Sequence, residues 1–216
     1  DAAAQERWGV APTLRFGLGA ASADLSLFHL EQDNVPDYGH PWVPATNDAL
    51  PLSRDQRAPV ARGNYYGLLD RDYERTQTDM ATLVFALPVG DGGSVRNLTR
   101  WGESRRDSVI TAPRFLGNDS TAIRRTAKTR DSEDRILSNV TDFSTVFDTG
   151  TLQHTLGAGV EFAREKSTNL ARAATDGALA DLFDPEYGAA YTGAVSRDPL
   201  RDASADARLG RRDRRC

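Results

Sequence analysis

The chain has 216 residues, and its 27 basic and 31 acidic side chains give a net charge of −4, which argues against a nucleic-acid-binding protein. The mean hydropathy is −0.53, and no run approaches the roughly 20 apolar residues of a transmembrane helix. These values exclude a helical membrane protein but not a β-barrel, because only alternate residues of a barrel strand face lipid. The single Cys216 cannot form a disulfide within the chain, and the three histidines lack metal-ligand spacing.

Strict alternation of apolar and polar residues predicts two strands, over Arg7–Gly19 and Leu152–Glu165. On the polar faces of these strands, Arg15 and Glu161 are typical of a wet barrel lumen. The apolar residues that we expect to point outward are Trp8, Val10, Leu14, Phe16, Leu18, Leu156, Val160 and Phe162.

Four other segments predict strands with weaker patterns. In chain order they are Asp24–Gln32, Arg75–Leu87, Ser94–Ser108 and Asp134–Asp148. The first of them changes its apolar face between Leu27 and Phe28, as a bulge or a strand that leaves the membrane would do.

The connections between these strands alternate between short and long. The short ones are Ala20–Ala23, Pro88–Gly93 and Asp148–Thr151, and the long ones are Asp33–Glu74, Val109–Glu133 and everything after Lys166. This order predicts hairpins with periplasmic turns near Ala21, Asp91 and Gly150 at one edge and extracellular loops at the other, as in outer-membrane barrels. The alternative is a soluble all-β domain with a few long loops.

Several segments, in one order along the chain, carry a resemblance to a known family. They are Arg7-Trp-Gly-Val-Ala-Pro, the run from Phe28 to Gly39 that contains Asp-Asn-Val-Pro-Asp-Tyr-Gly, Asn64–Tyr73, Arg106–Arg114, and Asp181–Pro185 with Tyr191–Gly193. Together they resemble the barrel of TonB-dependent siderophore receptors. The resemblance implies an all-β fold, in which antiparallel hairpins form part of a large transmembrane outer-membrane β-barrel with long extracellular loops.

The resemblance also divides the chain. We expect residues 1–197 to be a partial barrel of about six strands without a plug domain, against about 22 strands in the family. The chain begins at Asp1 without an initiator Met or signal peptide, and we interpret it as a fragment or a processed product. Residues 198–216 form an Arg-rich tail that does not match the family, and we interpret this tail as disordered or as read out of frame.

The function implied by the resemblance is TonB-dependent uptake of a ferric siderophore across the bacterial outer membrane, and we favour catecholate-type ligands. The implied partners are the ferric siderophore, the TonB complex through the missing plug region, and outer-membrane lipid, but no nucleic acid. No cofactor is expected, since iron enters only as part of the ferric siderophore. The sequence contains no nucleophile elbow, phosphate-binding loop or metal motif, so we expect no enzyme.

Candidate ligand contacts come from the two loops, because ferric siderophores are often anionic and aromatic and therefore suit arginine and aromatic side chains. The candidates are Tyr38, Trp42, Tyr65 and Tyr66 in the first loop, and Arg114, Arg124 and Arg125 in the second. Such aromatic side chains also pack within long loops or anchor at the membrane interface, which is the alternative for each of them. At the level of the whole protein, the alternatives are another outer-membrane barrel, such as a porin or a different nutrient receptor, and a soluble β-rich ligand-binding module.

Overall fold

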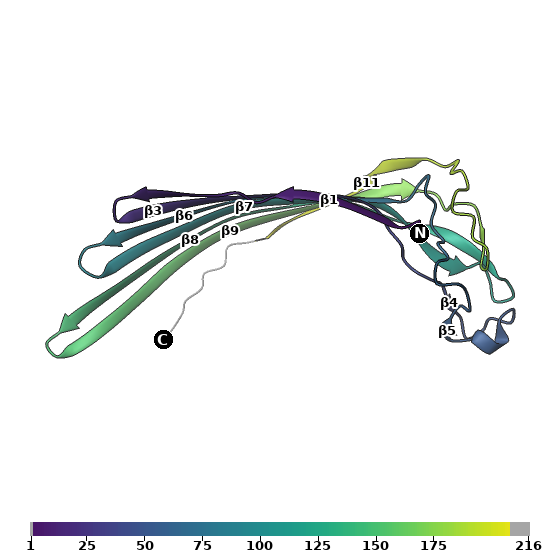
Figure 1. The fold of residues 1–216 in the computed structure, drawn as a ribbon, viewed down its shortest axis with the longest axis horizontal. Helices are drawn as coiled ribbons and strands as arrows, with labels where there is room; N and C mark the ends of the chain where they lie inside the picture. The colour runs from purple at the N-terminus through teal and green to yellow at the C-terminus, as the bar shows by residue number, and fades with distance from the viewer. Residues whose placement is uncertain (1, 208–216) are drawn as a thin grey trace.

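The computed structural model describes residues 2–207, and nearly all of the chain's long strands lie in one curved antiparallel sheet, seen edge-on in Figure 1. The strands are β1 Ala4–Val10, β2 Thr13–Leu18, β3 Ala21–Val35, β4 Trp42–Val43, β5 Gln56–Arg57, β6 Tyr73–Val89, β7 Gly93–Phe115, β8 Ala122–Thr149, β9 Leu152–Ala174, β10 Ala180–Asp181 and β11 Val195–Ala207. A short 3-10 helix, η1, covers Pro51–Ser53. Among the described residues, no helix has the length and apolar character to span a membrane.

Neighbouring strands follow the order β1-β3-β6-β7-β8-β9-β11, so most strands pair with the next long strand in the chain. β2 pairs with β3, β10 pairs with β8, and β4 and β5 form a separate small ladder. The predicted antiparallel hairpins are confirmed.

The first predicted strand, Arg7–Gly19, is split into β1 and β2 around Pro12, but its register is continuous. Val10 lies opposite His29 and Thr13 lies opposite Ser26, so both chains advance by the same number of residues across the gap. Proline has no N–H and cannot complete the ladder there. The backbone N of Leu27 still donates to the carbonyl O of Pro12, at 2.9 Å. The two pieces therefore act as one barrel strand with a missing hydrogen bond.

The tight turns all lie at one end of the sheet, and the long connections lie at the other (Figure 1). Gly19, Gly90 and Gly150 occupy these turns with φ of 71°, 58° and 65°. Tight hairpins with two residues (at Gly19 and Gly150) or three residues (at Gly90) between the strands use such left-handed conformations, which glycine adopts without strain. The turns predicted near Asp91 and Gly150 are thus confirmed, together with the common edge of all three. The turn predicted near Ala21 lies slightly earlier, at Gly19–Ala20, because Ala21 already pairs with Leu18.

Three strands extend further toward the loops than the sequence predicts. β7 and β8 extend to Phe115 and back to Ala122, so the predicted long loop Val109–Glu133 is mostly a projecting hairpin. β9 likewise continues to Ala174, beyond the expected end near Lys166. In the extension of β7, the residues from Ser108 to Pro113 are all buried, on both faces of the strand. A strand that is covered on both faces needs no alternation of apolar and polar residues, so the pattern by which the other strands were predicted is absent.

β11 occupies residues for which the sequence predicted no strand. It pairs with β9, with a shift in register between Asp198 and Ala203. A free sheet edge offers backbone hydrogen bonds to any extended segment, whatever its side-chain pattern. Residues 208–216 of the Arg-rich tail lie outside the described part of the chain, so the interpretation of the tail as disordered or as read out of frame stays a prediction.

In the half nearest the tight turns, the sheet has one apolar and one polar face, as predicted. Nearer the loops, the outward face carries charged side chains such as Glu103 and Arg105. Directly opposed residues of antiparallel strands share a face. The predicted outward side chains Trp8, Val10, Leu14, Phe16, Leu156, Val160 and Phe162 are all exposed on the apolar face. The side chain of Leu18, the remaining residue of this prediction, lies outside the part that the structure describes. Arg15 lies on the other face, where its Nε donates to Oδ1 of Asp24 at 2.6 Å, and the register places Glu161 on that face as well.

Candidate functional site

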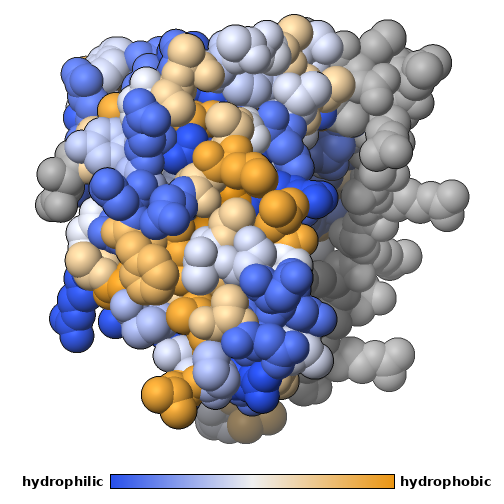
Figure 2. Space-filling view, turned by 90° about the vertical axis from the view of Figure 1, so that its right-hand side faces the viewer, coloured by the Kyte–Doolittle hydropathy of each residue, from blue (hydrophilic) through white to orange (hydrophobic). Residues whose placement is uncertain are grey.

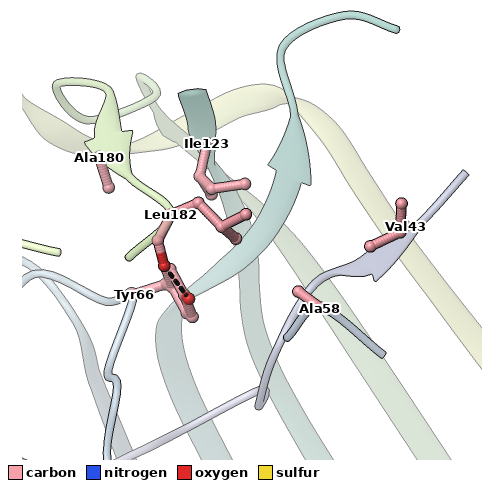
Figure 3. Packing of buried hydrophobic residues seen from close by; sticks show 6 residues of the cluster. All are labelled: Val43, Ala58, Tyr66, Ile123, Ala180 and Leu182. Carbon is pink, nitrogen blue, oxygen red and sulfur yellow. Dashed lines mark hydrogen bonds between the residues drawn. The ribbon is translucent and has the colours of Figure 1, made fainter. Parts of the chain in front are cut away.

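The loop end of the sheet has a small hydrophobic core of its own. It brings together a first loop segment (residues 36–72), the β7–β8 hairpin and a second loop segment (residues 175–194). The core residues are Val43, Ala58, Tyr66, Ile123, Ala180 and Leu182 (Figure 3). The hydroxyl of Tyr66 donates to the carbonyl O of Leu182 at 2.6 Å, which ties the two loop segments together. The loops are therefore packed against one another.

Two of the predicted ligand residues are exposed in the first loop segment. Tyr38 is 53% exposed and Trp42 is 59% exposed. The indole Nε1 of Trp42 donates to Oδ1 of Asp55 at 3.1 Å, which fixes the ring while its faces stay open. Both aromatic rings are thus available for stacking.

Two of the predicted arginines are exposed on the hairpin. Arg114 on β7 and Arg124 on β8 are directly opposite in register. Like charges that face each other across a ladder repel unless an anion lies between or beside them. The pair therefore concentrates positive charge at the far end of the hairpin.

The other three predicted residues are buried. Tyr65, Tyr66 and Arg125 are 3%, 1% and 1% exposed. The hydroxyl of Tyr65 donates to the carbonyl O of Pro36 at 3.1 Å. Burial is the main cause that raises the pKa of both tyrosines. These side chains support the loop core, as the packing alternative expects, and ligand contact by the exposed candidates stays a prediction.

Arg125 is unusual among these buried residues because it carries a charge. Its Nη2 donates to the carbonyl O of Glu186, and its Nε has no hydrogen-bond partner among residues 2–207. Desolvation, followed by repulsion from Arg71, lowers the pKa of Arg125. The guanidinium thus connects β8 with the second loop segment.

Four exposed apolar residues in and beside the second loop segment were not predicted from the sequence. These residues are Leu69, Leu179, Phe183 and Tyr187. The backbone N of Leu69 donates to the carbonyl O of Tyr187 at 3.1 Å. Figure 2 shows apolar side chains gathered among charged ones at the loop end of the molecule. The segment Asp181–Pro185 carries part of the family resemblance, but nothing in its pattern indicates an exposed aromatic ring. In residues 2–207, no group of three or more His, Cys, Asp or Glu side chains is arranged to hold a metal ion.

Comparison with known proteins gives this geometry a context. No protein-family model matches the chain. The catecholate siderophore receptor Fiu of Escherichia coli strain K12 is 35% identical over 185 residues, which cover 78% of this chain and 24% of Fiu. The probable TonB-dependent receptor BfrD of Bordetella pertussis is 32% identical over 167 residues, 74% of this chain and 21% of the relative. The chain is homologous to TonB-dependent siderophore receptors.

Solved receptor structures carry the same fold. The match to the crystal structure of Fiu in its open form covers 89% of this chain and 31% of the Fiu chain, with a TM-score of 0.72 and 32% sequence identity. The match to the crystal structure of the siderophore receptor PiuA from Acinetobacter baumannii covers 94% of this chain and 32% of the PiuA chain, with a TM-score of 0.76. At 22% identity, the match to PiuA bears on the fold alone.

The chain spans about a quarter of the length of the curated relatives that it matches. As a segment of a TonB-dependent receptor, it forms part of the wall of an outer-membrane β-barrel, which confirms the predicted fold class and location. The tight turns then lie at the periplasmic end, and the loop core lies at the extracellular end. The homologues are transport receptors and not enzymes.

Proposed function

We propose that this chain forms part of the wall and mouth of an outer-membrane receptor for TonB-dependent uptake of ferric siderophores of the catecholate type. The observation that carries the proposal is the 35% identity to the catecholate siderophore receptor Fiu over 78% of the chain. Iron is the cargo in this function and arrives already chelated by the siderophore.

The exposed residues of the loop end suit an anionic aromatic ligand. Trp42 and Tyr38 offer open ring faces, and aromatic pairs add attraction beyond simple burial. Arg114 and Arg124 offer planar guanidinium groups, which form charge-assisted hydrogen bonds with catecholate oxygens. We therefore propose these four residues as contacts on the path of the ligand into the barrel.

The proposed partners follow from the two faces of the sheet. The outward apolar residues are suited to outer-membrane lipid. Energy from the inner membrane would come through TonB acting on a plug region, a part of the family that this segment does not represent.

The test uses the full-length receptor in a strain without its own catecholate receptors. We expect growth on a ferric tris-catecholate as the iron source but not on a ferric hydroxamate. The double variant R114Q/R124Q should weaken binding by about tenfold, because it removes charge-assisted hydrogen bonds worth roughly 1.5 kcal/mol or more.

The matched control is Arg75→Gln. Arg75 shares the outward face with Asp33, to which its Nε donates at 3.1 Å, so it should not reach a ligand in the mouth. Growth on the hydroxamate alone, or equal losses in R75Q and R114Q/R124Q, would overturn the proposal.

A further inference from the structure

The three extracellular segments meet at one fully buried side chain, Arg71, at the end of the first loop segment. Its Nη1 donates to the carbonyl O of Thr175 at 3.1 Å, in the second loop segment, and to that of Arg125 at 3.4 Å, on β8. Its Nη2 donates to Oγ1 of Thr111, on β7. One planar guanidinium therefore contacts both strands of the hairpin and the second loop segment.

Asp72 makes this arrangement stable. Its Oδ1 accepts a hydrogen bond from Nε of Arg71 at 2.8 Å, and both side chains are completely buried. Its Oδ2 accepts hydrogen bonds from the backbone N of Thr111 at 3.0 Å and from that of Leu68 at 3.3 Å. A buried ion pair is tolerated when the remaining hydrogen-bonding groups of both partners are satisfied. The carboxylate thus neutralises Arg71 and binds β7 itself.

Tyr191 adds a second connection between the two loop segments. Its ring lies under the guanidinium carbon of Arg71, with 5.4 Å from that carbon to the ring centroid. Its backbone N donates to Oδ2 of Asp70 at 3.0 Å. The second loop segment is therefore held to the first through both a side chain and a backbone group.

We propose that Arg71 is a positioning residue for ligand capture. It joins the first loop segment, the hairpin and the second loop segment into one body that moves as a unit. The exposed Trp42, the arginine pair on the hairpin and the exposed Phe183 then keep fixed spacings, so that a ligand does not have to order three independent loops. The link between the segments stands on the contacts alone, whereas its effect on ligand capture rests on the proposed function.

The decisive variant in the full-length receptor is Arg71→Lys. Lysine keeps the charge but has no planar fork, and it cannot reach Asp72, Thr111 and Thr175 together. Hydrogen exchange should become faster in all three segments at once. The Kd for a ferric tris-catecholate should rise by about tenfold or more, because binding then has to order the loops. Heat-modifiable migration, which reports the closed barrel, should not change.

The matched control is Arg54→Lys. Arg54 pairs with Asp48, whose backbone N donates to the carbonyl O of Asn118 at the tip of the hairpin. Its loss should therefore affect exchange in the first loop segment and at that tip, but not in the second loop segment. If R71K prevents assembly, Thr111→Val replaces the test, since it removes only the acceptor of Nη2 and keeps the shape of the side chain. It should still increase exchange in the first loop segment and the hairpin together.

The outcomes separate the two parts of the proposal. Faster exchange confined to residues 36–72 in R71K would refute the joining of the three segments. Faster exchange in all three with unchanged affinity would refute the positioning role. If the unaltered receptor binds no ferric catecholate, the proposed function fails, while the exchange experiment still decides whether Arg71 joins the segments.

Discussion

The carboxamides of Asn97 on β7 and Asn139 on β8 hydrogen-bond to each other in both directions, with each Nδ2 at 3.1 Å from the other's Oδ1. Each Nδ2 also donates at 2.7 Å to a threonine hydroxyl, that of Thr141 for Asn97 and that of Thr99 for Asn139. The two hydroxyls donate back to the carboxamide oxygens at 3.2 and 3.4 Å. Every polar hydrogen of the four side chains is thereby used.

This closed network lies on the lipid-facing side of the sheet. The residues opposite its members on the neighbouring strands are Leu83, Phe85, Val160 and Phe162. Lipid offers no hydrogen bonds, so polar side chains at such a position need partners within the protein. Mutual pairing explains how four polar residues occur within the apolar belt.

We therefore predict that Asn139→Leu lowers the stability of the receptor by about 1–3 kcal/mol, because it leaves polar groups of Asn97 unpaired in an apolar environment. The double variant N97L/N139L should be less destabilised than N139L, since it removes both partners. Unfolding in urea, followed by heat-modifiable migration, measures both effects. A double variant whose loss equals the sum of the two single losses would contradict the closed network.

The assignment of faces predicts different effects for two adjacent residues of β2. Leu14→Arg places a charge against lipid and should cost about 2–4 kcal/mol at mid-depth, with less receptor assembled in the outer membrane. Arg15→Leu should be milder, because Arg15 and its partner Asp24 face the lumen. Spin labels check the assignment directly: a water-accessible label at position 14 with a lipid-accessible one at 15 would invert the faces.

A third prediction separates the buried arginine from the exposed ones. Arg125→Met should change the affinity for a ferric catecholate by less than about twofold, because its guanidinium is buried away from the ligand and Arg71 still joins β8 to the second loop segment through the carbonyl O atoms of Arg125 and Thr175. It removes the contact with Glu186 but also the repulsion from Arg71 that lowers the pKa of Arg125. Binding titrations of R125M beside R114Q/R124Q test this contrast. A larger loss in R125M would return Arg125 to the ligand contacts.

Sequence reasoning succeeded where the two sides of a strand face different solvents. Trp8, Val10, Leu14 and Phe16 face lipid, and this environment leaves a strict alternation in the sequence. The same reasoning failed for the β7–β8 hairpin above residue 109, where consecutive residues of β7 are buried on both faces of the strand and no alternation is required. The turns were predictable, because left-handed positions need glycine.

The candidate site was only partly predictable, as the neighbours Arg124 and Arg125 demonstrate. Arg124 is exposed and Arg125 is buried, with 1% of its surface exposed, because successive residues of a strand point to opposite sides. Which side is covered depends on the second loop segment, more than fifty residues further along the chain, where Glu186 accepts from Arg125. Local sequence carries no record of such a distant contact.

The last prediction concerns the periplasmic turn at Gly150, whose φ is 65°. An added Cβ would meet nothing within 4 Å, so the cost of Gly150→Ala comes from the backbone alone, about 1–2 kcal/mol for a left-handed alanine. Gly157→Ala on β9 is the matched control, because an added Cβ there also meets nothing within 4 Å and the φ of Gly157 is not positive. Alanine lowers the chain entropy of the unfolded state, so this variant should be more stable than the unaltered receptor by about 0.4–1 kcal/mol. Gly150→Asn should lose less than Gly150→Ala, because asparagine tolerates the left-handed region. Urea unfolding of the three variants gives the order, and equal midpoints for G150A and G157A would show that the turn does not require a left-handed residue.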